Sequence, residues 1–206
     1  MTDPTESARD DLAFVRALVT EGGQAQASVG EALLAGGLCY GLQCLVQSLF
    51  AFGVAAPGWL QLAVAIGPTL IFIALIVRIS IRDRQQSNQG VGTRALNAAF
   101  GGSGLAALTT AIIFGTLALR EKSLFIWLFH PLMVCVVQGT VWYIAFAIRR
   151  RPWFGLVSAG WFVSAIGLSL LVADPVSAWF VVLIGVALLL LMALPGWVLL
   201  RSGTRG

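Results

Sequence analysis

VSAWFVVLIGVALLLLMALPGWVL, residues 176–199, is an apolar run without a single charged residue, and it is one of six apolar runs in the chain. The others cover residues 32–52, 59–79, 95–118, 124–147 and 153–173. Each run is close to the ~20 residues that an α-helix needs to cross the hydrocarbon core of a bilayer. The sequence therefore predicts an all-α integral membrane protein, a six-helix bundle built from three antiparallel hairpins.

The composition also indicates a lipid environment. Apolar residues make up 58% and charged residues 11% of the 206 residues, which is more apolar surface than a soluble domain of this length can bury. Arginine is used far more than lysine, and alanine and glycine are abundant, a usage typical of GC-rich bacterial genomes. We therefore expect a multi-pass protein of the bacterial inner (plasma) membrane, with the lipid bilayer as its surroundings.

The basic residues fall almost entirely in alternate gaps between the runs. If the N-terminus is cytoplasmic, eleven of the thirteen basic residues lie inside and only Arg120 and Lys122 lie outside. The positive-inside rule then predicts that both termini are cytoplasmic. Because these charges flank spans and meet lipid headgroups, no nucleic-acid partner is expected. The residues assigned to basic cytoplasmic loops are Arg82, Arg84, Arg94, Arg149, Arg150 and Arg151.

The N-terminal segment, residues 1–30, is expected to be a cytoplasmic unit in front of a six-span domain (31–201) and a short cytoplasmic tail (202–206). Ser7 is a suitable helix cap, and Gly22-Gly23 is a suitable helix end. Between them, apolar residues recur at helical spacing, which predicts a short amphipathic helix over residues 7–21. The apolar positions are Leu12, Val15, Leu18 and Val19.

The helix at 7–21 is slightly acidic, whereas helices that lie on membranes usually carry a polar face rich in lysine and arginine. Docking onto the basic loops of the protein itself, or onto a cytoplasmic or membrane protein partner, is therefore favoured over lying on anionic lipid. The alternative is an ordinary solvated helix. The loop at 82–94 is the longest connection, and it is expected to be flexible and cytoplasmic.

Polar residues inside the spans are the candidate site, because ionisable groups in a membrane are costly. His130 lies well inside the fourth run, and counting from the external boundary puts it level with Gln47 of the first run. Tyr40 is similarly level with Gln138. Antiparallel packing of the first and fourth spans would therefore gather an intramembrane polar cluster consisting of Tyr40, Gln43, Gln47, His130 and Gln138.

This cluster has two interpretations. One is a small polar cavity that opens outward and has His130 as its titratable group. The other is a set of hydrogen bonds that hold helices together, each worth about 0.6–2 kcal/mol. Prolines 68, 131 and 195 are the candidate helix irregularities. The Gly37–Gly41 spacing predicts close packing, either against another helix of the chain or in a dimer.

Residues 11–22, DLAFVRALVTEG, are followed by a glycine-rich first span. This opening resembles a group of small uncharacterised proteobacterial multi-pass membrane proteins, with a weaker similarity at Gly92-Thr93-Arg94. The resemblance covers about the first 50 residues and implies no activity. Mitochondrial carriers share the three-hairpin plan, but the first, third and fifth runs here lack the Pro-x-Asp/Glu-x-x-Lys/Arg motif of that family.

Catalytic motifs are missing from the sequence. It has no Gly-x-Ser-x-Gly elbow, no Walker loop and no His-Glu-x-x-His motif, so no enzyme activity, cofactor or metal is expected. Cys39, Cys44 and Cys135 are interpreted as packing residues. The predicted function is therefore a non-enzymatic scaffold, regulator or accessory subunit. The alternative is a small-solute transporter or channel with a polar pathway near His130.

Overall fold

The computed structural model describes residues 4–83, 91–173 and 176–203, with side chains placed at 27–82, 94–173 and 176–202. In these ranges all regular structure is helical, and six segments are long and apolar enough to span a membrane. The prediction of an all-α, six-span protein is confirmed. The elements are α1 (Pro4–Ala51), α2 (Gly58–Asp83), α3 (Val91–Arg120), α4 (Leu124–Trp127), α5 (Phe129–Arg149), α6 (Pro152–Leu171), α7 (Ala178–Leu188), the π-helix η1 (Leu189–Ala193) and α8 (Leu194–Gly203).

The first helix is longer than expected. The region 7–21 is helical as predicted, but Gly22-Gly23 does not end the helix, and α1 continues without a break into the first span. The predicted helix end is therefore wrong. Glycine costs only about 1 kcal/mol relative to alanine inside a helix, which a long flanking helix can absorb. The expected boundary at residue 30 falls inside this helix, and the amphipathic face of residues 7–21 stays a prediction.

The predicted loop at 82–94 is shorter than expected, because α2 continues to Asp83 and α3 begins at Val91. Arg82 and Arg94 therefore lie on helices. Arg84 falls outside the described residues, as does the expected flexibility of the segment around it.

Two of the three prolines coincide with interruptions of a span. In the fourth span α4 and α5 meet at Leu128, and Pro131 follows in the first turn of α5, where its missing N–H is tolerated. In the sixth span η1 ends at Ala193, two residues before Pro195. There the N–H of Leu194 bonds to the carbonyl of Leu189, five residues back. Pro68 lies inside a continuous α2.

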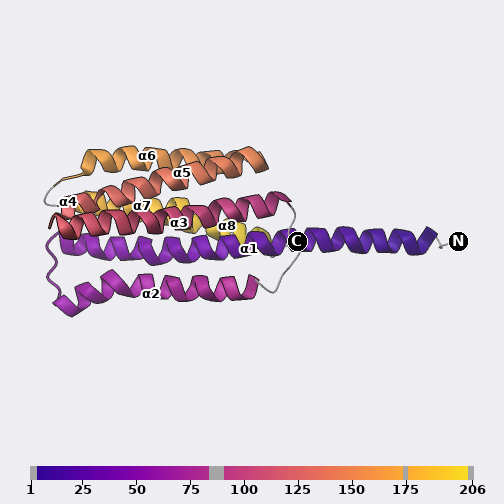
Figure 1. Ribbon diagram of the computed structural model, residues 1–206, viewed down its shortest axis with the longest axis horizontal. Coiled ribbons are helices and arrows are strands. Elements are labelled where there is room, and N and C mark those ends of the chain that lie inside the picture. The colour runs from indigo at the N-terminus through magenta and orange to yellow at the C-terminus, as the bar shows by residue number, and fades with distance from the viewer. Residues whose placement is uncertain (1–3, 84–90, 174–175, 204–206) are drawn as a thin grey trace.

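The helix α1 lies at the centre of the contacts in the bundle. It packs most heavily against the sixth span, formed by α7, η1 and α8, and it also carries α2 on its outer side. The other half of the bundle is built on α5, which packs between α6 and α3. Figure 1 shows α2 at one edge of the bundle and α6 at the opposite edge, with both chain ends toward the same end of the molecule.

The contact between α1 and the sixth span is close enough for the two backbones to meet. A Cβ atom added to Gly30 would lie 2.6 Å from the amide nitrogen of Leu200, and one added to Gly196 would lie 2.8 Å from the carbonyl oxygen of Gly30. Gly37 faces Ala193 in the same seam. The Gly37–Gly41 spacing therefore packs against a helix of its own chain. Small residues on both helices, such as Gly37 and Ala193, allow the two backbones to approach this closely.

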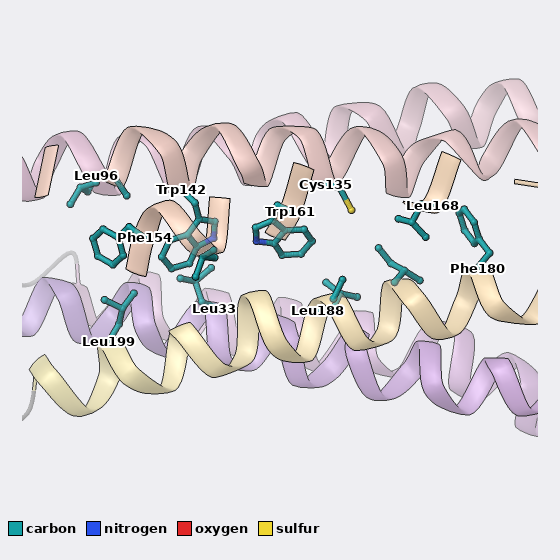
Figure 2. Close-up of a cluster of buried hydrophobic side chains, with 14 of the residues drawn as sticks. Leu33, Leu96, Cys135, Trp142, Phe154, Trp161, Leu168, Phe180, Leu188 and Leu199 are labelled. Atoms are coloured by element: carbon teal, nitrogen blue, oxygen red, sulfur yellow. The ribbon is translucent and has the colours of Figure 1, made fainter. Parts of the chain in front are cut away.

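Aromatic side chains fill the core between the two halves. Trp142 of α5 and Trp161 of α6 are completely buried. Figure 2 shows Leu96, Phe154, Leu199 and Trp142 at one end of this core and Leu168 and Phe180 at the other. Cys135 is also fully buried there, and all three cysteines are free, so the packing interpretation is confirmed for Cys135.

Candidate functional site

The structure separates the predicted polar cluster instead of gathering it. The expected packing of the first span against the fourth is wrong, because α1 packs on α2, α7 and α8 whereas α5 packs on α6 and α3. Equal depth in a membrane fixes only one coordinate of a side chain. Residues at one level still point to different neighbours around the helix axis, and the cluster is therefore divided among several interfaces.

Two of the three cluster residues on α1, Tyr40 and Gln43, contact α2. Gln43 donates from Nε2 to the carbonyl oxygen of Ala65 over 3.0 Å, while the ring of Tyr40 meets the edge of Phe72 with centroids 5.3 Å apart. Gln47, a turn further along, is partly buried in α1. The amide and the ring thus hold α2 on α1, as expected for hydrogen bonds and packing that join helices.

An ion pair joins the same two helices at their other end. Arg82 of α2 lies 2.8 Å from a carboxylate oxygen of Glu31 and donates to the hydroxyl of Ser28 over 3.2 Å. The sequence analysis assigned Arg82 to a loop, but the continuation of α2 to Asp83 brings it alongside α1. Arg82 therefore anchors the end of α2 that lies opposite the turn joining α1 to α2.

His130 belongs to a different interface. Its Nδ1 lies 3.3 Å from the hydroxyl of Thr110 on α3, and its ring lies over Trp127 with centroids 4.9 Å apart. Because Trp127 ends α4 and α5 begins at Phe129, the histidine lies in the first turn of α5, directly after the break between these helices. It contacts α3 rather than Gln47, so it forms a helix contact of the third and fourth spans.

Gln138 is buried in α5, and its Oε1 has no hydrogen-bond partner. Next to it, the hydroxyl of Ser158 on α6 donates to the carbonyl of Gly139 over 2.8 Å. The polar pairing in this region therefore joins α5 to α6. Tyr40 of α1, which equal depth predicted as the partner of Gln138, instead packs against Phe72 of α2.

The turn between α5 and α6 forms a second polar region, which consists of three consecutive arginines. Arg150 adopts the left-handed conformation with φ 53° and ends α5 through a bond from its N–H to the carbonyl of Phe146. Arg151 is the extended residue before Pro152, which starts α6. This tight reversal brings Arg149 and Arg151 to one pocket, and Arg150 is not among the residues that line it.

We call this the arginine-turn pocket, and it lies at the end of the core between α1, α3, α5, α6 and α8. Its cavity is about 30 Å³, which is enough room for a water molecule. Asn97 and the two arginines provide its polar side chains, and no acidic residue lines it among the side chains that the structure describes. The lining residues are Val29, Leu96, Asn97, Phe100, Trp142, Ala145, Arg149, Arg151, Phe154 and Leu199.

Trp142 is the residue that the sequence analysis missed. Its side chain is fully buried against Phe100, Trp153 and Phe154, yet its indole Nε1 has no hydrogen-bond partner. Buried tryptophan N–H groups usually have one. The sequence could have pointed to Trp142 through its spacing from Arg149. The two residues are seven positions apart, which is about two helical turns, and they therefore share one face of the helix.

Metal-ligand clusters are not found among the described residues, where no three His, Cys, Asp or Glu side chains gather. Comparison of the chain with protein-family models, with curated proteins and with solved structures gave no significant match.

Proposed function

We propose that this chain is a non-enzymatic scaffold, regulator or accessory subunit of the bacterial inner membrane. The end of the bundle that carries most of the arginines, among them Arg82, Arg94 and Arg149, faces the cytoplasm, in accordance with the positive-inside rule. The contact surface for a protein partner is the part of α1 before the first span, residues 4–26, which we call the N-terminal extension.

The length of α1 carries this proposal. The helix has 48 residues, which at 1.5 Å per residue corresponds to about 72 Å. The bilayer core is only about 30 Å thick, and the first span takes up Ala27–Ala51. Figure 1 shows the N-terminal part of α1 projecting beyond the rest of the bundle. A projecting helix presents a long surface outside the membrane.

The sequence of the N-terminal extension suits a protein partner with a basic surface. Helical spacing predicts that the apolar residues Leu12, Val15, Leu18 and Val19 share one face. Four acids against two arginines in residues 4–26 give a net charge of −2, which disfavours anionic lipid as the surface for this helix.

Continuity of α1 supplies a means of regulation. The same helix that forms the extension also packs against α2, α7 and α8. A partner bound to the extension is therefore joined by an unbroken helix to the centre of the bundle. Movement of the extension reaches the spans without passing through a flexible linker.

A solute pathway near His130 is the weaker candidate, since the groups that it needs lie in separate interfaces. Gln43 is bonded to α2, and His130 is paired with Thr110 of α3. Uptake of solute by reconstituted vesicles, lost when His130 and Gln47 are replaced by leucine, would favour that function instead.

Photo-crosslinking in native membranes tests the proposal. A photoreactive residue at position 19 is expected to give one discrete crosslinked protein, which is then identified by mass spectrometry and purified with the full-length chain. Val15→Ser with Leu18→Ser should abolish the crosslink, because it removes the apolar face.

The matched control is Ala13→Ser with Ala17→Ser, which adds the same hydroxyls on the opposite side of the predicted helix. This control should retain the crosslink. Equal crosslinking in both double variants, or no discrete product in any membrane sample, would contradict the proposed contact surface.

A further inference from the structure

The apolar positions of the N-terminal extension share a face with the residues through which α1 enters the core. Leu12 and Val19 precede Leu33 by 21 and 14 residues. Val15 likewise precedes Val29 by 14 residues. Seven residues make about two helical turns, so these spacings put all five positions on one face of the unbroken α1. Because Leu33 is buried in the core and Val29 lines the arginine-turn pocket, the predicted apolar face lies on the bundle-facing side of α1.

The turn between α5 and α6 lies beside the base of the extension on this same side. Val29 follows the extension by three residues and lines one pocket with Arg151. Arg150 and Arg151 are exposed, and neither makes an ion pair with a residue that the structure describes. Figure 1 shows α1 projecting well beyond the neighbouring ends of α5 and α6. The extension and the turn therefore form a corner with an apolar wall and a cationic floor.

We call this surface the helix corner. Its wall consists of Leu12, Val15 and Val19, and its floor consists of Arg150 and Arg151. The floor has a fixed shape, since the left-handed conformation of Arg150 and the restricted φ of Pro152 join α5 to α6 without a longer loop.

The bundle restricts what can occupy the helix corner. Parallel helices pack with their axes about 8–10 Å apart, and the α1 of a second copy placed along the wall would continue toward the membrane as the first span of that copy. That path is already taken by α8, because a Cβ atom added to Gly30 would lie 2.6 Å from the amide nitrogen of Leu200. Straight α1 helices of two copies therefore cannot pair in parallel through this face.

The chemistry of the two surfaces defines the occupant. An apolar face that projects beyond the bundle needs apolar side chains to cover it, and guanidinium groups bind carboxylates through paired hydrogen bonds. Lipid is excluded along the wall, which extends away from the spans (Figure 1). The occupant is thus a protein that ends above the bundle, with apolar residues toward the wall and acidic residues toward the floor.

We propose that the helix corner seats a water-soluble protein, with an apolar helix along the wall and carboxylates on Arg150 and Arg151. This inference rests on the proposed function. It adds the side of α1 on which the partner lies, the solubility of the partner and a second contact on the bundle. A partner held at both places would couple the extension to α5 and α6.

Photo-crosslinking of the full chain in native membranes, from positions 17, 19 and 150 in turn, tests the helix corner. Helical spacing puts position 19 on the wall and position 17 on the opposite face of α1. We expect the same protein, identified by mass spectrometry and without a membrane span, from positions 19 and 150, and loss of this product at position 17. The peptide crosslinked to position 150 should contain aspartate or glutamate.

Removal of the floor charges provides a second measurement. Arg150→Asn combined with Arg151→Gln should lower the crosslink yield at position 19 roughly three- to tenfold, since exposed ion pairs have modest effects. Asparagine tolerates the left-handed conformation of position 150. Arg120→Gln combined with Lys122→Asn is the matched control, because Lys122 also has a positive φ, of 50°, and this control should leave the yield unchanged.

The outcomes separate this inference from the proposed function. A partner crosslinked at position 19 but not at position 150, or equally at positions 17 and 19, would overturn the helix corner and leave the proposed function standing. Absence of any partner at position 19 would contradict both. A product of twice the mass of the chain at position 19, a partner that spans the membrane, or equal losses in the two charge variants would each overturn the helix corner.

Discussion

The indole Nε1 of Trp161 donates to the carbonyl oxygen of Leu191 over 3.2 Å, and Leu191 lies four residues before Pro195. In a regular helix that carbonyl would accept from the N–H of residue 195, which proline lacks. The tryptophan of α6 therefore satisfies a backbone group that the sixth span leaves open. In lipid no water is available to take its place.

Trp161→Phe is expected to destabilise the protein by about 1 kcal/mol, because it leaves the Leu191 carbonyl without a donor while conserving most of the buried ring. Pro195→Ala supplies a backbone N–H, so the cost of Trp161→Phe should be smaller on that background. Unfolding in mixed detergent micelles, carried out as a double-mutant cycle, measures the coupling. Additive effects of the two substitutions would show that the proline and the indole are independent.

Gly196→Ala is expected to destabilise the contact of α1 with the sixth span by about 1–3 kcal/mol, since overpacking costs this much. The added methyl would lie 2.8 Å from the carbonyl oxygen of Gly30. Gly104→Ala in α3 is the control, because nothing lies within 4 Å of its added Cβ. The control should be neutral or slightly stabilising in the same unfolding assay. Equal changes in stability for Gly196→Ala and Gly104→Ala would mean that α1 and α8 are not in close backbone contact at Gly196.

The continuity of α1 through Gly22-Gly23 can be tested directly by measuring a distance across these glycines. Spin labels at positions 13 and 27, introduced after the native cysteines are replaced, should give a narrow distance distribution near 21 Å, which is 14 residues at about 1.5 Å each. Gly22→Ala should leave this distance unchanged. Gly22→Pro should broaden it and reduce partner crosslinking from residue 19. A broad distribution in the unmodified chain would restore a helix end at the glycines.

Charge reversal tests the anchor of α2. Glu31→Gln and Arg82→Gln each remove the 2.8 Å ion pair, and each is expected to increase proteolytic cleavage in the segment after α2. The pair is partly exposed, so the effect on global stability should be small. Glu31→Arg combined with Arg82→Glu should restore protection. Failure of the exchanged pair to do so would mean that Arg82 acts through Ser28 or another contact.

Number and length of the spans were predictable, because apolar length is a local property of the sequence. Helix partners were not. Gln47 and His130 do lie in spans, but depth gives no angle around the helix axis, and apolar faces in lipid do not specify their neighbours. Gly22-Gly23 was misinterpreted as a helix end. Glycine is common at helix ends, but its free-energy cost inside a helix is small enough to be tolerated when the residues on both sides favour a helix. Trp142 was missed because tryptophan is common in membrane helices, and only burial reveals its unpartnered N–H.

The pairing of α1 with the sixth span constrains how the protein is made. Ribosomal synthesis delivers α1 first, but the surface that covers Gly30 and Gly37 belongs to η1 and α8, which emerge only after the other spans. Until then this glycine face has only lipid or a membrane chaperone against it. Closure of the bundle is thus a late, long-range event in biogenesis, and a chain truncated after α6 would insert its helices without completing the fold.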